Sequence, residues 1–238
     1  MFEDDDDAQF DGQLRGDLAL FESFLSGSTL GFIDSDRMEA IIDHYFAEGD
    51  FKKAKRAAEM ADINFSYNPI FKLRIAQALS GLKSFSESLS LLSTLEQTGL
   101  PRFEVWVTYG TIFSQMEDYT SAIHYLSMAL PLADKEDQIE IYLDISFAYQ
   151  KLKDMDGSIE VLTKGLSVNP TSESLLYELG FTYDRVGRFQ DSIDTYLKYI
   201  EENPFANMAW YNLGNAYSKI ENFEKAIWAY DYSILIFD

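Results

Sequence analysis

Few side chains in this 238-residue sequence are of the types that carry out catalysis or bind metals. The chain has no cysteine, which excludes disulfides, thiolate zinc sites and cysteine nucleophiles. Its two histidines, His44 and His124, stand 80 residues apart, so a histidine-based triad or a histidine-rich metal site has little to build on. We expect both histidines to lie at the surface or edge of a helix.

Two other local patterns give no chemistry either. The run Asp4-Asp5-Asp6-Asp7 lacks the glycine-punctuated spacing of a calcium loop and is typical of a solvated chain end. The segment from Gly180 to Gly187 lacks the strand, lysine and spacing of a phosphate-binding loop. No nucleophile, base and orienting group can be placed together. The sequence therefore predicts a protein that is not an enzyme and needs no metal or cofactor.

The overall charge of the chain is strongly negative, which makes nucleic acids and anionic membranes unfavourable partners. Lys and Arg number 19 against 40 Asp and Glu, giving a net charge of −21, which excludes a basic nucleic-acid footprint and disfavours anionic membranes. Apolar residues make up 47% and aromatic residues 15%, ample for a folded core. The acidic start is the reverse of a cationic signal peptide, and no apolar run of about 18 residues could span a bilayer. We expect a cytoplasmic protein.

The elements that must position any site repeat along the chain. Cutting the sequence at residues 35, 69, 103, 139, 173 and 207 gives units of 34 residues, with one two-residue insertion near Asp137. Position 8 of these units is small in most of them, as in Gly180 and Gly214, and position 20 is Ala or Ser in all six. Positions 7 and 11 are large and apolar. Because residues three or four apart share a helix face, each unit predicts two antiparallel helices that approach closely at positions 8 and 20.

The last unit carries the most specific pattern. Its string WYNLGNAY, residues 210–217, followed by Ala226 and Tyr230, resembles the signature of the tetratricopeptide repeat. This resemblance implies an all-α, right-handed α-solenoid, or superhelix, of antiparallel helix pairs. The six expected repeats are 35–68, 69–102, 103–138, 139–172, 173–206 and 207–238.

The two ends of the array differ from its middle. Residues 1–34 read as an acidic tail followed by one amphipathic helix with Leu14, Leu18, Phe21, Phe24 and Leu25 on one stripe, ended by Gly27; Ser35 would cap the next helix. This helix would cover the first repeat or, alternatively, occupy a groove. Apolar residues 234–237 close the sequence without a polar capping helix. Further repeats or a second stacked copy would cover that end.

The resemblance also implies where a binding groove lies. Family members line a concave face with positions 2, 5, 9, 12 and 13 of the first helix of each repeat. In repeats four to six these positions are rich in aromatic and polar residues, and the candidate groove residues are Leu143, Phe147, Tyr177, Phe181, Asp184, Arg185, Tyr211, Asn215 and Lys219. The alternative is that the aromatic residues only pack between neighbouring first helices.

Two functions follow from this interpretation. The first is a noncatalytic scaffold or adaptor that holds a peptide or helix of another protein in the groove. The family's lysine-based clamp for chaperone carboxylates is not expected, because position 5 never carries lysine and only Asn215 matches at position 9. The alternative function is structural self-assembly, as a homodimer joined through the uncovered carboxyl end or the amino-terminal helix.

Overall fold

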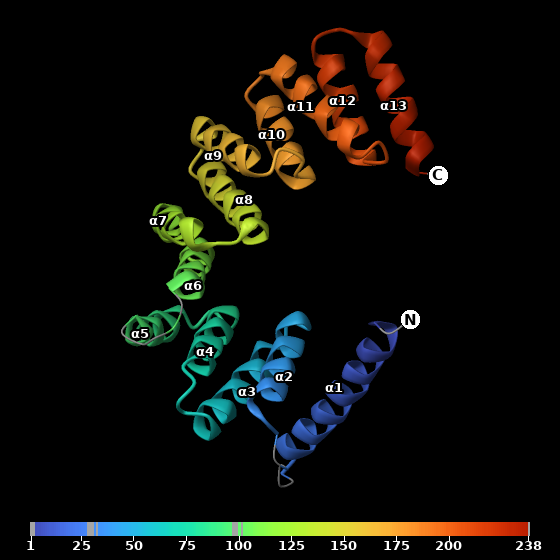
Figure 1. Cartoon of the computed structure of the whole chain (residues 1–238). Helices are drawn as coiled ribbons and strands as arrows, with labels where there is room; N and C mark the ends of the chain where they lie inside the picture. The colour runs from blue at the N-terminus through green and yellow to red at the C-terminus, as the bar shows by residue number, and fades with distance from the viewer. Residues whose placement is uncertain (1–2, 28–30, 32, 97–99, 101, 238) are drawn as a thin grey trace. The chain divides into compact units, whose positions relative to one another are not determined.

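The computed structural model describes residues 3–27, 31, 33–96, 100 and 102–237, with side chains described from residue 12 onward (Figure 1). Every regular element in these residues is helical. The earlier helices are α1 (Glu3–Leu25), α2 (Ser35–Ala47), α3 (Phe51–Asn64), α4 (Ile70–Gly81), α5 (Phe85–Leu95) and α6 (Arg102–Gln115). They are followed by α7 (Tyr119–Ala129), the 3₁₀ turn η1 (Leu130–Leu132), α8 (Lys135–Lys151), α9 (Met155–Val168), α10 (Glu173–Arg185), α11 (Phe189–Glu202), α12 (Asn207–Lys219) and α13 (Phe223–Phe237).

The chain divides into two compact units, the first ending at Ile112 and the second beginning at Phe113, within α6. Inside each unit, helices that follow one another in sequence pack side by side, as α2, α3, α4 and α5 do in the first and α7 to α13 do in the second. None of the described helices is both long and apolar enough to cross a bilayer.

Each helix pair closes through the same turn. The second residue after the first helix of each pair has a left-handed backbone conformation, with φ between 60° and 77°. These residues recur at the repeat spacing and are Gly49, Lys83, Glu117, Lys153, Gly187 and Glu221. The next backbone N–H donates to the carbonyl five residues earlier, as Asp118 does to Phe113 at 2.9 Å. The side chain of Asp118 then accepts from the N–H of Ser121 and so caps the second helix.

Positions 8 and 20 of the units lie in direct contact. The Ser88 hydroxyl donates to the carbonyl of Ala76 at 2.6 Å, and the Ser192 hydroxyl donates to that of Gly180 at 2.9 Å. At Gly214 an added Cβ would lie 2.6 Å from the ring of Tyr230. Small residues recur here because the two helices of a pair leave no space for a larger side chain.

Two local expectations need correction. Asp34, one residue before Ser35, is the cap of α2: its carboxylate accepts from the N–H of Arg37, and Ser35 is the first helical residue. Helix α1 begins at Glu3, so the backbone of the acidic run is helical rather than a separate tail; the side chains of Asp4 to Asp7 lie outside the described residues. The insertion near Asp137 lengthens α8, which begins at Lys135 behind an Asp134 cap.

Helix α1 packs against the first helix pair. Phe21 is fully buried, and Leu14, Leu18 and Phe24 pack on the same core, whereas Leu25 is exposed although the apolar stripe predicts it to be covered. The helix stops as predicted, with Gly27 at φ 102°.

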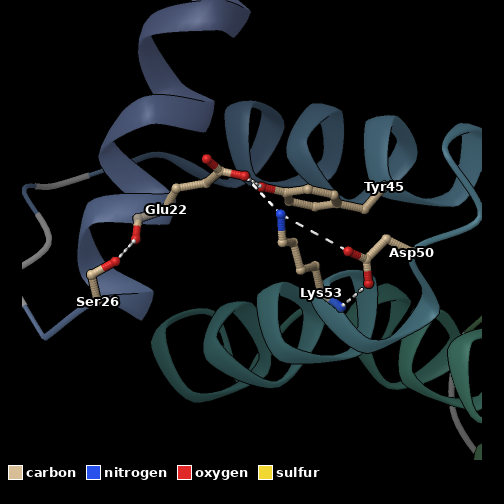
Figure 2. A network of polar contacts seen from close by, with 5 residues as sticks. All are labelled: Glu22, Ser26, Tyr45, Asp50 and Lys53. Carbon is tan, nitrogen blue, oxygen red and sulfur yellow. Dashed lines mark hydrogen bonds and ion pairs between the residues drawn. The ribbon is translucent and has the colours of Figure 1, made fainter.

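Polar contacts also hold α1 in place. Figure 2 shows Glu22 of α1 reaching Lys53 of α3, whose Nζ lies 2.7 Å from Glu22 Oε1, and receiving a hydrogen bond from the Tyr45 hydroxyl at 3.3 Å. Lys53 also lies 3.9 Å from Asp50. One carboxylate of α1 therefore joins all three helices.

Candidate functional site

The predicted groove residues lie on three helices of the second unit. Leu143 and Phe147 are on α8, and Tyr211, Asn215 and Lys219 are on α12; α10, which contacts both helices, carries the other four. Their spacing within each helix places them on one face, apart from the stripe that enters the core.

Four aromatic side chains form what we call the aromatic face: Phe147, Tyr177, Phe181 and Tyr211. Phe147 is 47% exposed, Phe181 38% and Tyr211 48%. Tyr177 is half-buried, and its ring lies 6.5 Å from that of Tyr196 in α11. Phe147 and Tyr211 also contact rings of neighbouring helices, Tyr119 at 6.3 Å and Tyr230 at 5.8 Å, but they and Phe181 still expose much of their rings.

A cleft of about 560 Å³ lies beside the aromatic face, and we call it the acidic cleft. Apolar and aromatic residues make up part of its wall and carboxylates another part. Its lining consists of Leu143, Asp144, Phe147, Gln150, Glu173, Ser174, Tyr177, Glu178 and Tyr199. Helices α8 and α10 supply most of these residues, and Tyr199 comes from α11.

Among the described residues, the carboxylates of the acidic cleft have no cationic partner. The ion pairs within the described part of the second unit join Lys164 to Glu160, Arg188 to Asp191 and Lys219 to Asp184. None of these includes Asp144, Glu173 or Glu178. Glu173 accepts a neutral hydrogen bond from the side-chain amide of Asn203 at 2.8 Å.

Local pKa shifts agree with an excess of negative charge. Partial loss of hydration at the cleft wall, followed by repulsion from Glu140, raises the pKa of Asp144. Burial, followed by the neighbouring Glu173 carboxylate, raises the pKa of the Tyr199 phenol. The secondary contributions to these shifts, from the Glu140 and Glu173 carboxylates, are consistent with an excess of negative charge in the cleft.

A second, smaller cavity of about 250 Å³ lies between α10 and α12, and we call it the polar cavity. It is lined by Phe181, Asp184, Tyr196, Asn212, Asn215, Ser218, Lys219 and Tyr230. Three of its buried atoms make no hydrogen bond of normal geometry among the described residues, although the side chains of Tyr196 and Asn212 lie close to each other: Asp184 Oδ1, Tyr196 OH and Asn212 Nδ2. Because buried polar atoms are normally paired, these atoms can hydrogen-bond to water or to a ligand.

Three cations on the same three helices already have partners. Lys219 Nζ lies 2.6 Å from Asp184, and Arg185 donates to the side chain of Gln150 at 3.3 Å. Lys151 lies 5.0 Å above the ring of Phe147. Asn215, the one match to the clamp position, accepts from the Tyr230 hydroxyl at 2.8 Å.

Sequence reasoning missed several residues that line the acidic cleft or the polar cavity and share position 6 of the repeat. Asp144, Glu178 and Asn212 precede the position 9 residues Phe147, Phe181 and Asn215 by three. A spacing of three lies on the same helix face, so extending the groove positions to include position 6 would have identified them. Tyr199, at position 27 of its repeat, packs on the core of the last repeats and also lines the acidic cleft.

The same face of the first unit is polar. Arg74 of α4 lies 3.1 Å from both Glu39 and Asp43 of α2, and it also donates to Gln77. Leu73, at position 5, is buried. The aromatic face and the two cavities described above belong to the second unit.

A tetratricopeptide repeat family model matches residues 139–172 and 209–231, which include α9 and much of α8, α12 and α13. Two solved structures illustrate the likeness in fold. MamA is 19% identical, with a TM-score of 0.55 over 87% of this chain and 96% of that chain. YrrB, described as a TPR protein with an unusual peptide-binding site, is 20% identical, with a TM-score of 0.57 over 76% of this chain and 92% of that chain. The search of curated protein sequences gives no match.

Proposed function

We propose that this chain, a tetratricopeptide repeat protein, is a noncatalytic scaffold that holds a peptide segment of a partner protein. The segment lies along α8, α10 and α12, against the aromatic face. The observation that carries this proposal is the exposure of Phe147, Phe181 and Tyr211 beside two cavities. Aromatic side chains next to pockets are the usual anchors of protein interfaces, and their exposure is unfavourable until a partner covers them.

The surroundings of the aromatic face support the same proposal. The acidic cleft can take a side chain, and the polar cavity offers hydrogen-bonding atoms that no described residue satisfies. These are the two kinds of contact that hold an extended peptide: pockets for side chains and polar groups for the backbone. YrrB, with a similar fold, is described as having a peptide-binding site, which makes this use of the fold reasonable.

A paired substitution tests the proposal. The full chain is used to select binders from a displayed library of random peptides of about 12 residues, and their affinities are then measured for Phe147→Ala/Phe181→Ala. We expect roughly 2 kcal/mol or more to be lost for each true anchor. Phe205→Ala is the matched control, because Phe205 is 79% exposed and lies outside both cavities. Unchanged affinity in the double variant would contradict the groove assignment.

One observation favours a second function, self-assembly through α13. This helix exposes a group of large apolar side chains, Ile227, Trp228, Tyr232, Ile234, Leu235 and Phe237. An apolar surface of this kind favours burial against another copy. Light scattering over a concentration series should then give twice the monomer mass, and Ile234→Lys/Leu235→Lys should restore the monomer. A monomeric wild-type chain at high concentration would contradict self-assembly.

A further inference from the structure

The acidic cleft combines two kinds of wall that a single ligand group could use together. Phe147 and Tyr177 present aromatic surface, and Asp144 and Glu178 stand one turn or less away on the same helices. A lysine or arginine side chain has a matching composition: an apolar stem and a cationic end. The stem can pack on the rings while the cation reaches the carboxylates.

Charge complementarity separates this ligand from the alternatives. The carboxylates of Asp144, Glu173 and Glu178 form no ion pair among the described residues, whereas Lys219 and Arg185 on the same helices already contact Asp184 and Gln150. An acidic segment would therefore meet unpaired negative charge in the cleft and find the nearby cations engaged. A neutral apolar segment would leave the carboxylates desolvated without compensation.

We infer that the acidic cleft receives a lysine or arginine side chain of the bound segment, with an adjacent apolar residue of that segment packed on the aromatic face. This inference rests on the proposed peptide-binding function and adds to it the chemical class of the partner: a basic segment containing at least one apolar anchor. The net charge of −21 acts in the same direction, because it speeds the approach of a basic partner.

The peptides selected on the full chain give the first test. They should be enriched in lysine or arginine next to an apolar residue, relative to the input library, and raising the salt concentration should weaken their binding. Enrichment of acidic or uncharged peptides would overturn this inference while leaving peptide binding intact. Failure to enrich any peptide above uncoated support would contradict the proposed function, and this inference with it.

Charge-neutralising variants then locate the contact. Asp144→Asn/Glu178→Gln should weaken binding of a selected basic peptide by about fivefold or more and reduce its salt dependence. Glu201→Gln/Asp231→Asn removes the same net charge from exposed sites outside the cleft and should change the affinity less than about twofold. Glu173 is left unchanged because it holds Asn203.

A double-mutant cycle separates direct contact from a general field. Replacing the basic residue of the peptide by glutamine should abolish most of the difference between wild type and Asp144→Asn/Glu178→Gln. Equal losses for the lysine and glutamine peptides would show that the carboxylates act on something other than that side chain. Circular dichroism of each variant checks that the helical content is unchanged.

Discussion

Asp17 of α1 and Arg37 of α2 form a forked ion pair, in which guanidinium Nε and Nη2 donate to the two carboxylate oxygens. Asp17 is 3% exposed and is therefore a buried charge. Such a charge is tolerated only when it is paired and hydrogen-bonded. Together with Phe21, this pair makes the position of α1 on α2 specific rather than a loose apolar contact.

Replacing Arg37 by methionine should release α1 from the first unit. The substitution leaves the buried Asp17 carboxylate without its partner, and we expect the free energy that holds α1 in place to fall. Hydrogen exchange measured by mass spectrometry should show faster exchange in α1 and α2. Arg56→Met is the control, because the Arg56 side chain is 57% exposed and, among the described residues, is paired with Glu59 of the same helix. Unchanged exchange of α1 in Arg37→Met would contradict this role.

The contacts of α1 should also depend on pH. The hydrogen bond from Lys53 lowers the pKa of Glu22, so this stabilisation is present above pH 4.5 and is lost as the pH falls through the lowered value. Burial, followed by Glu22, raises the pKa of Tyr45 from 10.0 to about 12. The stability that the neutral, buried Tyr45 phenol contributes is present below pH 10.0 and is lost as the pH rises toward 12.

The protection of the α1 amides is the slowing of their exchange compared with that of an unfolded chain at the same pH. This protection should therefore be greatest between the pH at which Glu22 becomes protonated and the pH at which Tyr45 loses its proton. Glu22→Gln should flatten the acid side of the profile. If the protection of α1 falls at the same acidic pH in Glu22→Gln and in wild type, groups other than Glu22 cause that fall.

Two glycine-to-alanine substitutions should have opposite effects. At Gly214 the new Cβ would lie 2.6 Å from the Tyr230 ring, so Gly214→Ala should destabilise the chain by about 1–3 kcal/mol. At Gly16, an exposed position in α1, no atom outside the adjacent backbone of the helix lies within 4 Å of the added Cβ. Gly16→Ala should therefore increase helix stability by about 0.5–1 kcal/mol. Urea unfolding monitored by circular dichroism measures both, and a stable Gly214→Ala variant would show that the helix pair can separate without cost.

Tyr196→Phe should leave the unfolding free energy of the unliganded chain unchanged or raise it by up to about 1 kcal/mol. The Tyr196 hydroxyl is buried and makes no hydrogen bond of normal geometry among the described residues, and its neighbouring polar group is the side chain of Asn212, so its removal costs at most one weak protein hydrogen bond. Burial raises the pKa of this phenol, as expected for a hydroxyl that is poorly solvated. A loss of more than about 1 kcal/mol in urea unfolding would mean that the hydroxyl makes a stabilising hydrogen bond. Tyr183→Phe, on a half-buried tyrosine outside the cavity, is the control.

The period of the sequence is sufficient to predict the helical hairpins. Small residues at positions 8 and 20 are imposed by backbone approach, so Ala76 and Ser88, or Gly180 and Ser192, stand out as columns when the repeats are aligned with one another. The turn at Lys83 is less visible. A lysine can adopt the left-handed conformation there, but only the repeat spacing, not the residue type, predicts it.

The candidate site is predicted only in part. Helix geometry identifies the aromatic residues because their spacing is local. It cannot show that Tyr199 of α11 reaches the same cleft as Phe147 of α8, because such contacts depend on how successive helices pack. Nor can it show that Lys219 is neutralised by Asp184, 35 residues away, and is therefore less available to a ligand.

The most direct test of the central claim is the affinity of a selected peptide for the full chain and for Phe147→Ala/Phe181→Ala, measured by isothermal titration calorimetry. The two rings are 47% and 38% exposed, so their removal should leave the fold intact while eliminating two anchors. We predict a loss of binding of roughly 1,000-fold, because two anchors of about 2 kcal/mol each together contribute about 4 kcal/mol, with helical content unchanged and Phe205→Ala binding as wild type. The same dissociation constant for the double variant and wild type would contradict the claim that this face holds the partner.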